Sequence, residues 1–135
     1  MPRKGIFVAL TRPTSESPED HAAFNKWYDE HHVPDTLLLP GFVRGRRYKR
    51  ADAQLLPDKA TDPGFDYLVI YEVDDIDRVP DARAMLPRLA EISTEFLSPA
   101  IDSSSTRAFI FEEIADIDEA TPVPDGVDLD SSDGG

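Results

Sequence analysis

The sequence predicts an α+β fold in which a four-stranded antiparallel sheet carries two helices on one face. Four short apolar segments, rich in β-branched and aromatic residues, alternate with two segments of helical character. Their order is strand, helix, strand, strand, helix, strand. With 135 residues and 40% hydrophobic content, the chain has the size of one domain with one modest core.

The first strand is predicted at residues 4–11, and a helix follows it. Ser17 stands where an N-cap is needed, Pro18 takes the first helical position, and acidic residues occupy the first turn. Because a proline disfavours helical geometry at the residue before it, Pro34 should end the helix at about His32.

The second strand is predicted at residues 42–50. Simple alternation places Phe42, Arg44, Arg46 and Tyr48 on one side of it. Residues 51–64 have no period and predict a long loop, and loops of that length often serve a function. The third strand is expected at residues 65–73.

The second helix contains two prolines, so we expect its main part to start near Asp81 or Pro87. The last strand is predicted at residues 107–114. The complete order is that of a ferredoxin-like βαββαβ fold. Three of its strands are apolar on both faces, and no third helix is available to cover the second face, so we expect a homodimer.

Charge and composition exclude several partners. The net charge of −13 argues against nucleic acid, which is bound through basic patches. We expect residues 1–114 to form the domain and residues 115–135 to form a disordered acidic tail, because that segment is acidic and rich in Pro, Gly and Ser. No apolar run is long enough for a membrane span, and the first residues turn polar too soon for a signal peptide, so a cytoplasmic protein is expected.

The chain has no cysteine, no glycine-rich phosphate loop and no dinucleotide fingerprint, so we expect no cofactor. A metal site is not expected either. The adjacent side chains of His31 and His32 diverge, and the sequence offers no strong third ligand. Any chemistry must therefore come from histidine, tyrosine, carboxylates or bases.

Residues 24–48 contain the only tryptophan and two of the three histidines. His32, at the predicted helix end, is the candidate general acid or base, because the helix dipole favours an imidazolium there. Asp29, three residues earlier, could orient its ring. The alternative is a histidine that caps the last helical carbonyls. His31 is expected to pack beside Trp27. Helical geometry places His31 nearer than His32 to the middle of the buried face.

Other side chains could contact a ligand. Trp27 and Tyr28 are most simply core residues, but the Tyr28 hydroxyl could meet a substrate. The phenols of Tyr48 and Tyr71 could line a cavity or serve cross-strand packing. Arg46 could bind a carboxylate or enolate oxygen, whereas the neighbouring arginines should pair with surface acids. His21 is expected to be a solvated surface residue.

One succession of residues resembles EthD-like proteins of the dimeric α+β barrel superfamily. It comprises Trp27-Tyr28, His32-x-Pro34, Pro40-Gly41-Phe42 and Arg46-Arg47-Tyr48. The resemblance implies that two ferredoxin-like subunits pack sheet to sheet, with a small-molecule cavity between sheet and helices or at the sheet interface. It also implies that His32 faces the cavity. The preceding position, often acidic in such proteins, is His31 here.

Members of that superfamily include cofactor-independent oxygenases, polyketide cyclases, dehydratases, isomerases and proteins with no known activity. We therefore expect a small cofactor-independent enzyme that uses a histidine as general acid/base on a small apolar carbonyl or phenolic compound. Cyclisation, dehydration, isomerisation and decarboxylation share that step. The alternatives are a non-catalytic dimeric protein that binds a small molecule or is structural, and a cofactor-free monooxygenase.

Overall fold

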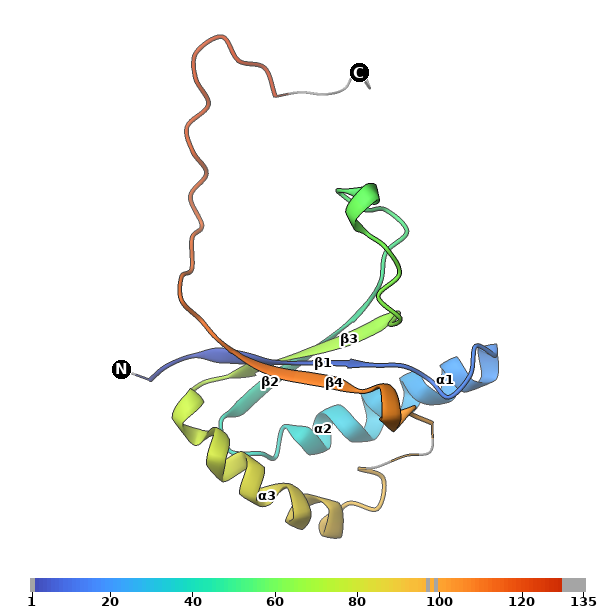
Figure 1. Ribbon diagram of the computed structural model, residues 1–135. Coiled ribbons are helices and arrows are strands. Elements are labelled where there is room, and N and C mark those ends of the chain that lie inside the picture. The colour runs from blue at the N-terminus through green and yellow to red at the C-terminus, as the bar shows by residue number, and fades with distance from the viewer. Residues whose placement is uncertain (1, 97, 99, 130–135) are drawn as a thin grey trace.

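Four strands form one antiparallel sheet in the order β2-β3-β1-β4 (Figure 1). The computed structural model describes residues 2–96, 98 and 100–129. The strands are β1 (Gly5–Thr11), β2 (Phe42–Lys49), β3 (Tyr67–Val73) and β4 (Arg107–Glu112). This is the predicted ferredoxin-like topology, and every predicted strand is confirmed with its ends shifted by at most a few residues.

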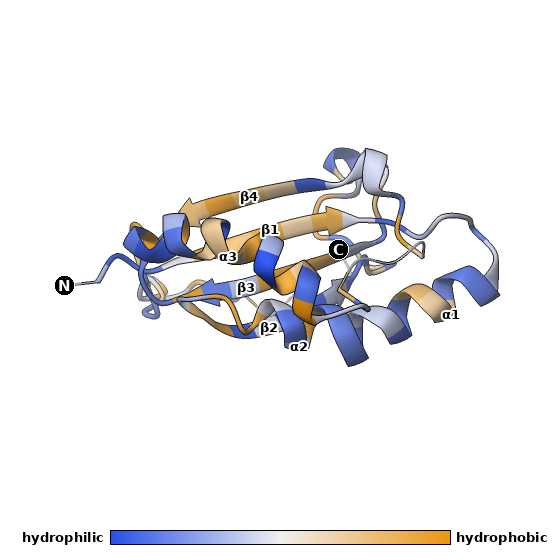
Figure 2. Cartoon of the chain, turned by 90° about the horizontal axis from the view of Figure 1, so that it is seen from below, coloured by the Kyte–Doolittle hydropathy of each residue, from blue (hydrophilic) through white to orange (hydrophobic). Residues whose placement is uncertain are grey.

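The helices cover one face of this sheet (Figure 1). They are α1 (Pro18–Trp27), the short α2 (Val33–Thr36) and α3 (Val79–Ile92). The start of α1 follows its sequence signals, since the Ser17 hydroxyl accepts a hydrogen bond from the amide of Asp20 at 3.1 Å. Seen from the helix side, hydrophobic residues lie along the strands while the outward surfaces of the helices are largely polar (Figure 2).

Helix α3 begins at Val79, after a short 3-10 turn (Ile76–Arg78), which agrees with the predicted start near Asp81. The alternative start at Pro87 is wrong, because the helix continues through that proline. Pro80 lies in the first turn, where a missing amide hydrogen removes no helical hydrogen bond. Pro87 lies inside the helix, and the carbonyl that it leaves unpaired belongs to Arg83, which is exposed to solvent. Water can therefore replace the lost bond.

The core lies between the helices and the inner face of the sheet. Its fully buried large side chains come from α1, from α3 and from the central strand β3; they are Tyr71, Phe24, Leu89, Val69 and Val73. The aromatic residues of the core contact one another in pairs that are mostly tilted or edge to face, such as Phe24 and Tyr28 with their centroids 4.9 Å apart. The π turn described below is packed into this layer.

Among the residues that the structure describes, no α-helix packs on the opposite face of the sheet (Figure 1). The β2–β3 connection, residues 50–66, and the segment after β4 both rise from that side (Figure 1). The connection contains one short turn of 3-10 helix, η2 (Pro57–Lys59). Residues 113–129 form no helix or strand, and the end of the predicted tail, 130–135, lies outside the described residues. Among the helices of the described ranges, none has the length and apolar character required to cross a membrane.

Candidate functional site

A turn of π-helix, η1 (Tyr28–His32), joins α1 to α2. The amide of Val33 donates to the carbonyl of Tyr28, five residues earlier, so this turn holds one residue more than an α-helical turn. The predicted end of the helix near His32 is therefore wrong, because Val33 keeps helical angles (φ −66°, ψ −50°) and the chain stays helical to Thr36. Pro34 fits at the start of α2, where its missing hydrogen is tolerated.

The imidazole of His32 is packed among three aromatic rings. Its centroid lies 4.6 Å from that of Trp27, 5.2 Å from that of Tyr28 and 4.8 Å from that of Phe96. Nδ1 is 2.9 Å from the backbone oxygen of Phe96. A carbonyl oxygen only accepts, so Nδ1 carries the hydrogen and Nε2 carries the lone pair. Within the described part of the chain, Nε2 has no hydrogen-bond partner.

Burial lowers the pKa of His32 below its ordinary value of 6.5, and the bond to the Phe96 carbonyl and the charge of Asp35 offset only part of that effect. The predicted strengthening of this base by a helix end is therefore wrong. The helix does not end at His32, and loss of solvation dominates. The ring is neutral near pH 7, with one nitrogen lone pair unused.

Asp29 does not orient His32, contrary to the prediction. Its carboxylate accepts a hydrogen bond from Nη1 of Arg47 at 2.9 Å, and 64% of its side chain is exposed. The wider turn is the reason, because residues in a π turn rotate less about the axis and the spacing of three no longer places two side chains together. The acceptor that holds the His32 ring is the backbone carbonyl of Phe96.

The segment that follows α3 clamps the π turn. The indole Nε1 of Trp27 donates to the carbonyl of Glu95 at 2.5 Å, and His32 donates to the next carbonyl. The Ser93 hydroxyl donates to the carboxylate of Asp35. Trp27 thus serves the core and the anchoring of this segment, and the backbone of residues 93–96 sets the orientation of the imidazole.

Two tyrosine hydroxyls lie between the π turn and the sheet. Tyr28 Oη is 2.6 Å from Thr11 Oγ1, and burial raises the pKa of Tyr28. Tyr71 Oη is buried and lacks a hydrogen-bond partner among the described residues. Burial also raises the pKa of Tyr71; the Thr36 hydroxyl, close but outside hydrogen-bond geometry, offsets this only in part. Thr36 itself donates to the carbonyl of His32 at 2.7 Å.

Arg46 lies on the sheet face opposite to His32. A β-bulge after Phe42 inserts one residue, so Phe42 faces the core while Arg46 and Tyr48 face the uncovered side. The expectation that these three residues share a side is therefore wrong. Arg46 pairs with Glu72 at 2.7 Å, with both side chains more than 40% exposed. Tyr48 is 48% exposed.

Arg47 is the arginine that the bulge turns toward the helices, and sequence reasoning assigned it to the surface. Its side chain is 17% exposed. The guanidinium lies 4.7 Å from the centroid of the Tyr28 ring and binds Asp29. The sequence does not distinguish Arg47 from the other three arginines between positions 44 and 50. Only the position of the bulge shows which of them faces the helices.

His31 and His32 occupy different environments. His31 lies on the outer side of the π turn and, with Trp27, lines an open groove of about 460 Å³ that does not include His32. The His32 side chain is half-buried, and aromatic rings pack against its imidazole. His31 therefore faces this groove. That His32 faces a cavity between the sheet and the helices stays a prediction.

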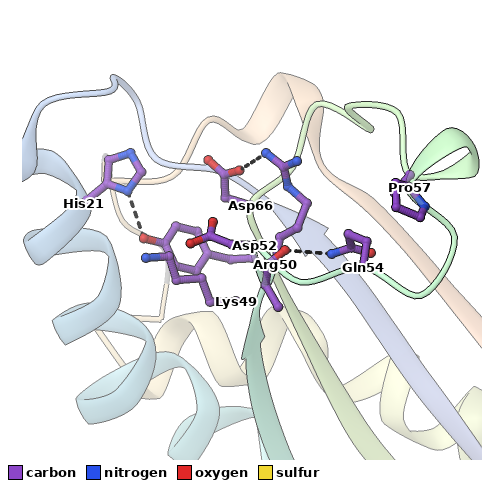
Figure 3. A pocket seen from close by; sticks show the side chains of 10 residues that line it. His21, Lys49, Arg50, Asp52, Gln54, Pro57 and Asp66 are labelled. Carbon is purple, nitrogen blue, oxygen red and sulfur yellow. Dashed lines mark hydrogen bonds and ion pairs between the residues drawn. The ribbon is translucent and has the colours of Figure 1, made fainter. Parts of the chain in front are cut away.

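His21 is not a free surface residue, contrary to the prediction. Its Nδ1 lies 2.9 Å from Tyr67 Oη, and both residues line a cavity of about 530 Å³ below the β2–β3 connection (Figure 3). A signal was present in the sequence, because His21 precedes the buried Phe24 by three residues and so shares its side of the helix.

No family model matches the chain, and no curated protein matches it in sequence. Solved structures do match. The Arabidopsis thaliana protein At3g17210 aligns at 16% identity over 84% of this chain and 98% of its own, with a TM-score of 0.57. An EthD family protein from Bacillus halodurans C-125 aligns at 16% identity over 82% and 99%, with a TM-score of 0.51. SnoaB, a cofactor-independent oxygenase from Streptomyces nogalater, aligns at 18% identity over 87% and 99%, with a TM-score of 0.52.

The chain has the fold of the EthD-like proteins of the dimeric α+β barrel superfamily. Dimeric ferredoxin-like proteins of unknown function from Thermobifida fusca and Jannaschia are also among the matching structures. The resemblance inferred from residues 24–48 is thereby confirmed for the fold. At these identities the likeness concerns the fold alone.

Proposed function

We propose that the chain is a small cofactor-independent enzyme in which His32 acts as general acid or base on a small apolar carbonyl or phenolic compound. One observation carries the proposal. The imidazole is half-buried against aromatic rings and neutral near pH 7, its tautomer is fixed by a backbone carbonyl, and Nε2 keeps a lone pair without a partner among the described residues. A base of this kind needs an orienting partner on the other nitrogen, and the carbonyl of Phe96 supplies it.

The proposed step is removal of a proton next to a carbonyl. Nε2 of His32 takes the proton from carbon, and the electron pair moves to the carbonyl oxygen, which gives an enolate. The enolate oxygen needs a hydrogen-bond donor, and a hydroxyl without a protein partner can supply it. The Tyr71 hydroxyl has no partner among the described residues, and it lies on the same side of the sheet as His32. Trp27 and Tyr28 would contribute apolar walls. Asp29 has no part in this step, because it is paired with Arg47.

Arg46 and Tyr48 cannot serve the same step, because they lie across the sheet from His32. Among proteins of this fold, SnoaB is a cofactor-independent oxygenase and the Passiflora edulis protein is a hydroxynitrile lyase. These two names support a small-molecule enzyme in general. Cyclisation, dehydration and isomerisation can begin with this proton transfer. In a decarboxylation the enolate forms by loss of carbon dioxide, and the protonated His32 would then return a proton to its carbon.

Hydrogen–deuterium exchange at carbon tests the proposal without a known product. The chain is incubated in D₂O with a panel of aryl ketones and β-diketones, and deuterium next to the carbonyl is followed by mass spectrometry. We expect exchange above the buffer rate, lost in His32→Asn and retained in His31→Asn. Equal rates in the two variants, with native circular dichroism, would remove His32 from the mechanism.

A second candidate is a non-catalytic small-molecule-binding or structural protein. The observation that favours it is that His32 lines neither the groove beside His31 nor the cavity beside His21. Saturable binding of a ketone without deuterium exchange would support it. A cofactor-free monooxygenase is distinguished by consumption of dissolved oxygen during turnover.

The chain is proposed to work as a homodimer. The sheet face without helices carries apolar side chains from three strands: Ile6, Val8, Leu10, Leu68, Ile70, Phe109 and Phe111. A face of this kind is normally covered, and most soluble oligomers are symmetric pairs. The dimeric ferredoxin-like proteins that share the fold support the same arrangement.

A further inference from the structure

The cavity below the β2–β3 connection is separate from the π turn. It lies where the first turn of α1 meets the end of β2 and the start of β3, and the connection forms its far wall (Figure 3). None of the residues that line it belongs to η1 or contacts His32. Its volume of about 530 Å³ is in the range that accommodates a small organic molecule.

A hydrogen-bond network runs along the wall of this cavity and ends at His21. Nη2 of Arg47 donates to Oδ1 of Asn25 at 2.7 Å, so the amide nitrogen of Asn25 points the other way. That nitrogen donates to Tyr67 Oη at 3.4 Å. Tyr67 Oη lies 2.9 Å from Nδ1 of His21, and which of the two donates depends on the tautomer of the imidazole. In the tautomer that carries its hydrogen on Nε2, Nδ1 accepts from the Tyr67 hydroxyl.

A carboxylate stands behind the imidazole. Oε2 of Glu16 is 3.6 Å from Nε2 of His21, an ion-pair distance that is too long for a hydrogen bond. In the described ranges Nε2 has no hydrogen-bond partner, although the atom itself is buried. The Glu16 side chain is 90% exposed and free to rotate closer. The order carboxylate, imidazole, phenol is one that can move a proton off the phenol.

Lys49 supplies a positive charge to the same cavity. It lies beside Tyr67 in the strand register and makes no ion pair within the part of the chain that the structure describes. Arg50, the other cation in the wall, is held by Asp66 at 2.9 Å and also faces the charges of Asp62 and Asp52. Lys49 is therefore the cation available to a negatively charged oxygen.

An apolar hollow adjoins the cavity. It measures about 190 Å³ and shares Lys49, Arg50, Asp66 and Tyr67 with the larger space. Its apolar walls include Leu10 and Leu68, which lie on the sheet face proposed to be covered in the dimer, so a ligand that reaches the hollow would lie at the edge of that interface. A ligand with one hydroxyl and a flat apolar body matches this pair of spaces better than a phosphate or a sugar, which would leave the hollow unused.

We propose that this cavity binds a phenol or an enol and takes the proton from its hydroxyl through Tyr67. The ligand O–H bond breaks and its proton goes to Tyr67 Oη, while the original phenol proton passes to Nδ1 of His21. The electron pair stays on the ligand oxygen, which faces the ammonium of Lys49, and the imidazolium faces Glu16. Arg47 and Asn25 are positioning residues. This proposal does not rest on the role of His32.

The test uses 4-nitrophenol, whose anion absorbs visible light whereas its neutral form does not. The full chain is titrated into the probe at a pH where the free probe is mostly neutral, and equilibrium dialysis measures binding separately. We expect a saturable rise of the anion band. Lys49→Met should weaken binding by about tenfold or more. Lys59 is the control, because it is an exposed lysine of the β2–β3 connection that does not line the cavity. Lys59→Met should bind the probe like the wild type.

Two variants separate proton transfer from binding. Tyr67→Phe removes the proton acceptor, so the probe should bind but stay neutral. Glu16→Gln changes only an exposed side chain and so preserves the fold, and it should reduce the fraction of bound probe that is ionised. The proposal is overturned if the wild type gives no saturable anion band, if Lys49→Met binds like the wild type, or if Glu16→Gln retains the full band.

Discussion

Tyr28 Oη and Thr11 Oγ1 lie 2.6 Å apart, and both side chains are buried. This hydrogen bond links the π turn to β1, the strand between β3 and β4. The ring of Tyr28 also contacts the imidazole of His32. The bond therefore sets the position of the turn, and with it the histidine, above the sheet.

Tyr28→Phe should destabilise the protein by about 1–3 kcal/mol, because it leaves the buried hydroxyl of Thr11 without a partner. Thr11→Val should do the same to Tyr28. The double variant should be more stable than the sum of the single effects predicts, since neither polar group is then left alone. Urea unfolding of the four proteins measures this coupling. Additive single effects would show that the contact is not a stabilising bond.

His32 should make stability depend on pH. Since its pKa is lowered in the folded state, the unfolded chain binds the proton more readily, and stability is complete above about pH 6.5 and falls as the pH decreases toward the folded value. Urea unfolding at about pH 7.5 and about pH 5.5 compares the wild type with His32→Gln. The variant should lose less stability on acidification. His31→Gln, on the outer side of the turn, is the control and should behave like the wild type.

Gly45 is required by close packing between β2 and α2. A Cβ atom there would lie 2.8 Å from Cγ1 of Val33 and 3.1 Å from the ring of Tyr71. Gly45→Ala should therefore lower the free energy of unfolding by about 1–3 kcal/mol. Adding Val33→Ala should restore part of the loss that the alanine causes. Thermal unfolding measures both, and an unchanged melting temperature in Gly45→Ala would contradict the packing described here.

Arg47→Ala should destabilise the protein by roughly 1–2 kcal/mol, because a mostly buried guanidinium loses Asp29, Asn25 and the Tyr28 ring. Arg88→Ala is the matched control. That side chain is 71% exposed and meets only Glu91 at 3.4 Å, so its effect should stay within about 0.5 kcal/mol. Chemical unfolding of the two variants compares them directly, and equal effects would refute the structural role of Arg47.

Lysine substitutions on the uncovered sheet face should separate the proposed dimer. Phe109 and Phe111 are 49% and 54% exposed in the single chain, so replacing both by lysine leaves the monomer fold intact. Light scattering should give twice 15.0 kDa for the wild type and 15.0 kDa for the variant. Leu86→Lys on α3 should remain dimeric. A monomeric wild type would overturn the proposal.

Much of the fold could be predicted because it depends on signals averaged over many residues. Apolar periodicity located all four strands, and Ser17 with Pro18 located the start of α1. The element order then left one common topology. The alternative start of α3 at Pro87 was wrong because the residue whose carbonyl loses its partner there, Arg83, is exposed to solvent, and the sequence does not contain that information.

The site could not be predicted as well, because it depends on two single-residue irregularities. The bulge after Phe42 exchanges the faces of Arg46 and Arg47, and the π turn separates Asp29 from His32. Pattern counting assumes constant periods and is blind to both. The same assumption ended the helix at His32. It therefore predicted that the helix dipole would favour protonation of a histidine that in the structure lies in mid-helix.

The π turn amounts to one inserted residue in an otherwise regular helix. Removing Glu30, an exposed member of the turn, would let the segment return to α-helical geometry. Either the residues from His31 onward or those before Tyr28 would then turn by about 100° relative to the sheet. The His32 imidazole would then move away from the three aromatic rings that it contacts. Chain length at this one place thus decides which of two adjacent histidines belongs to the interior.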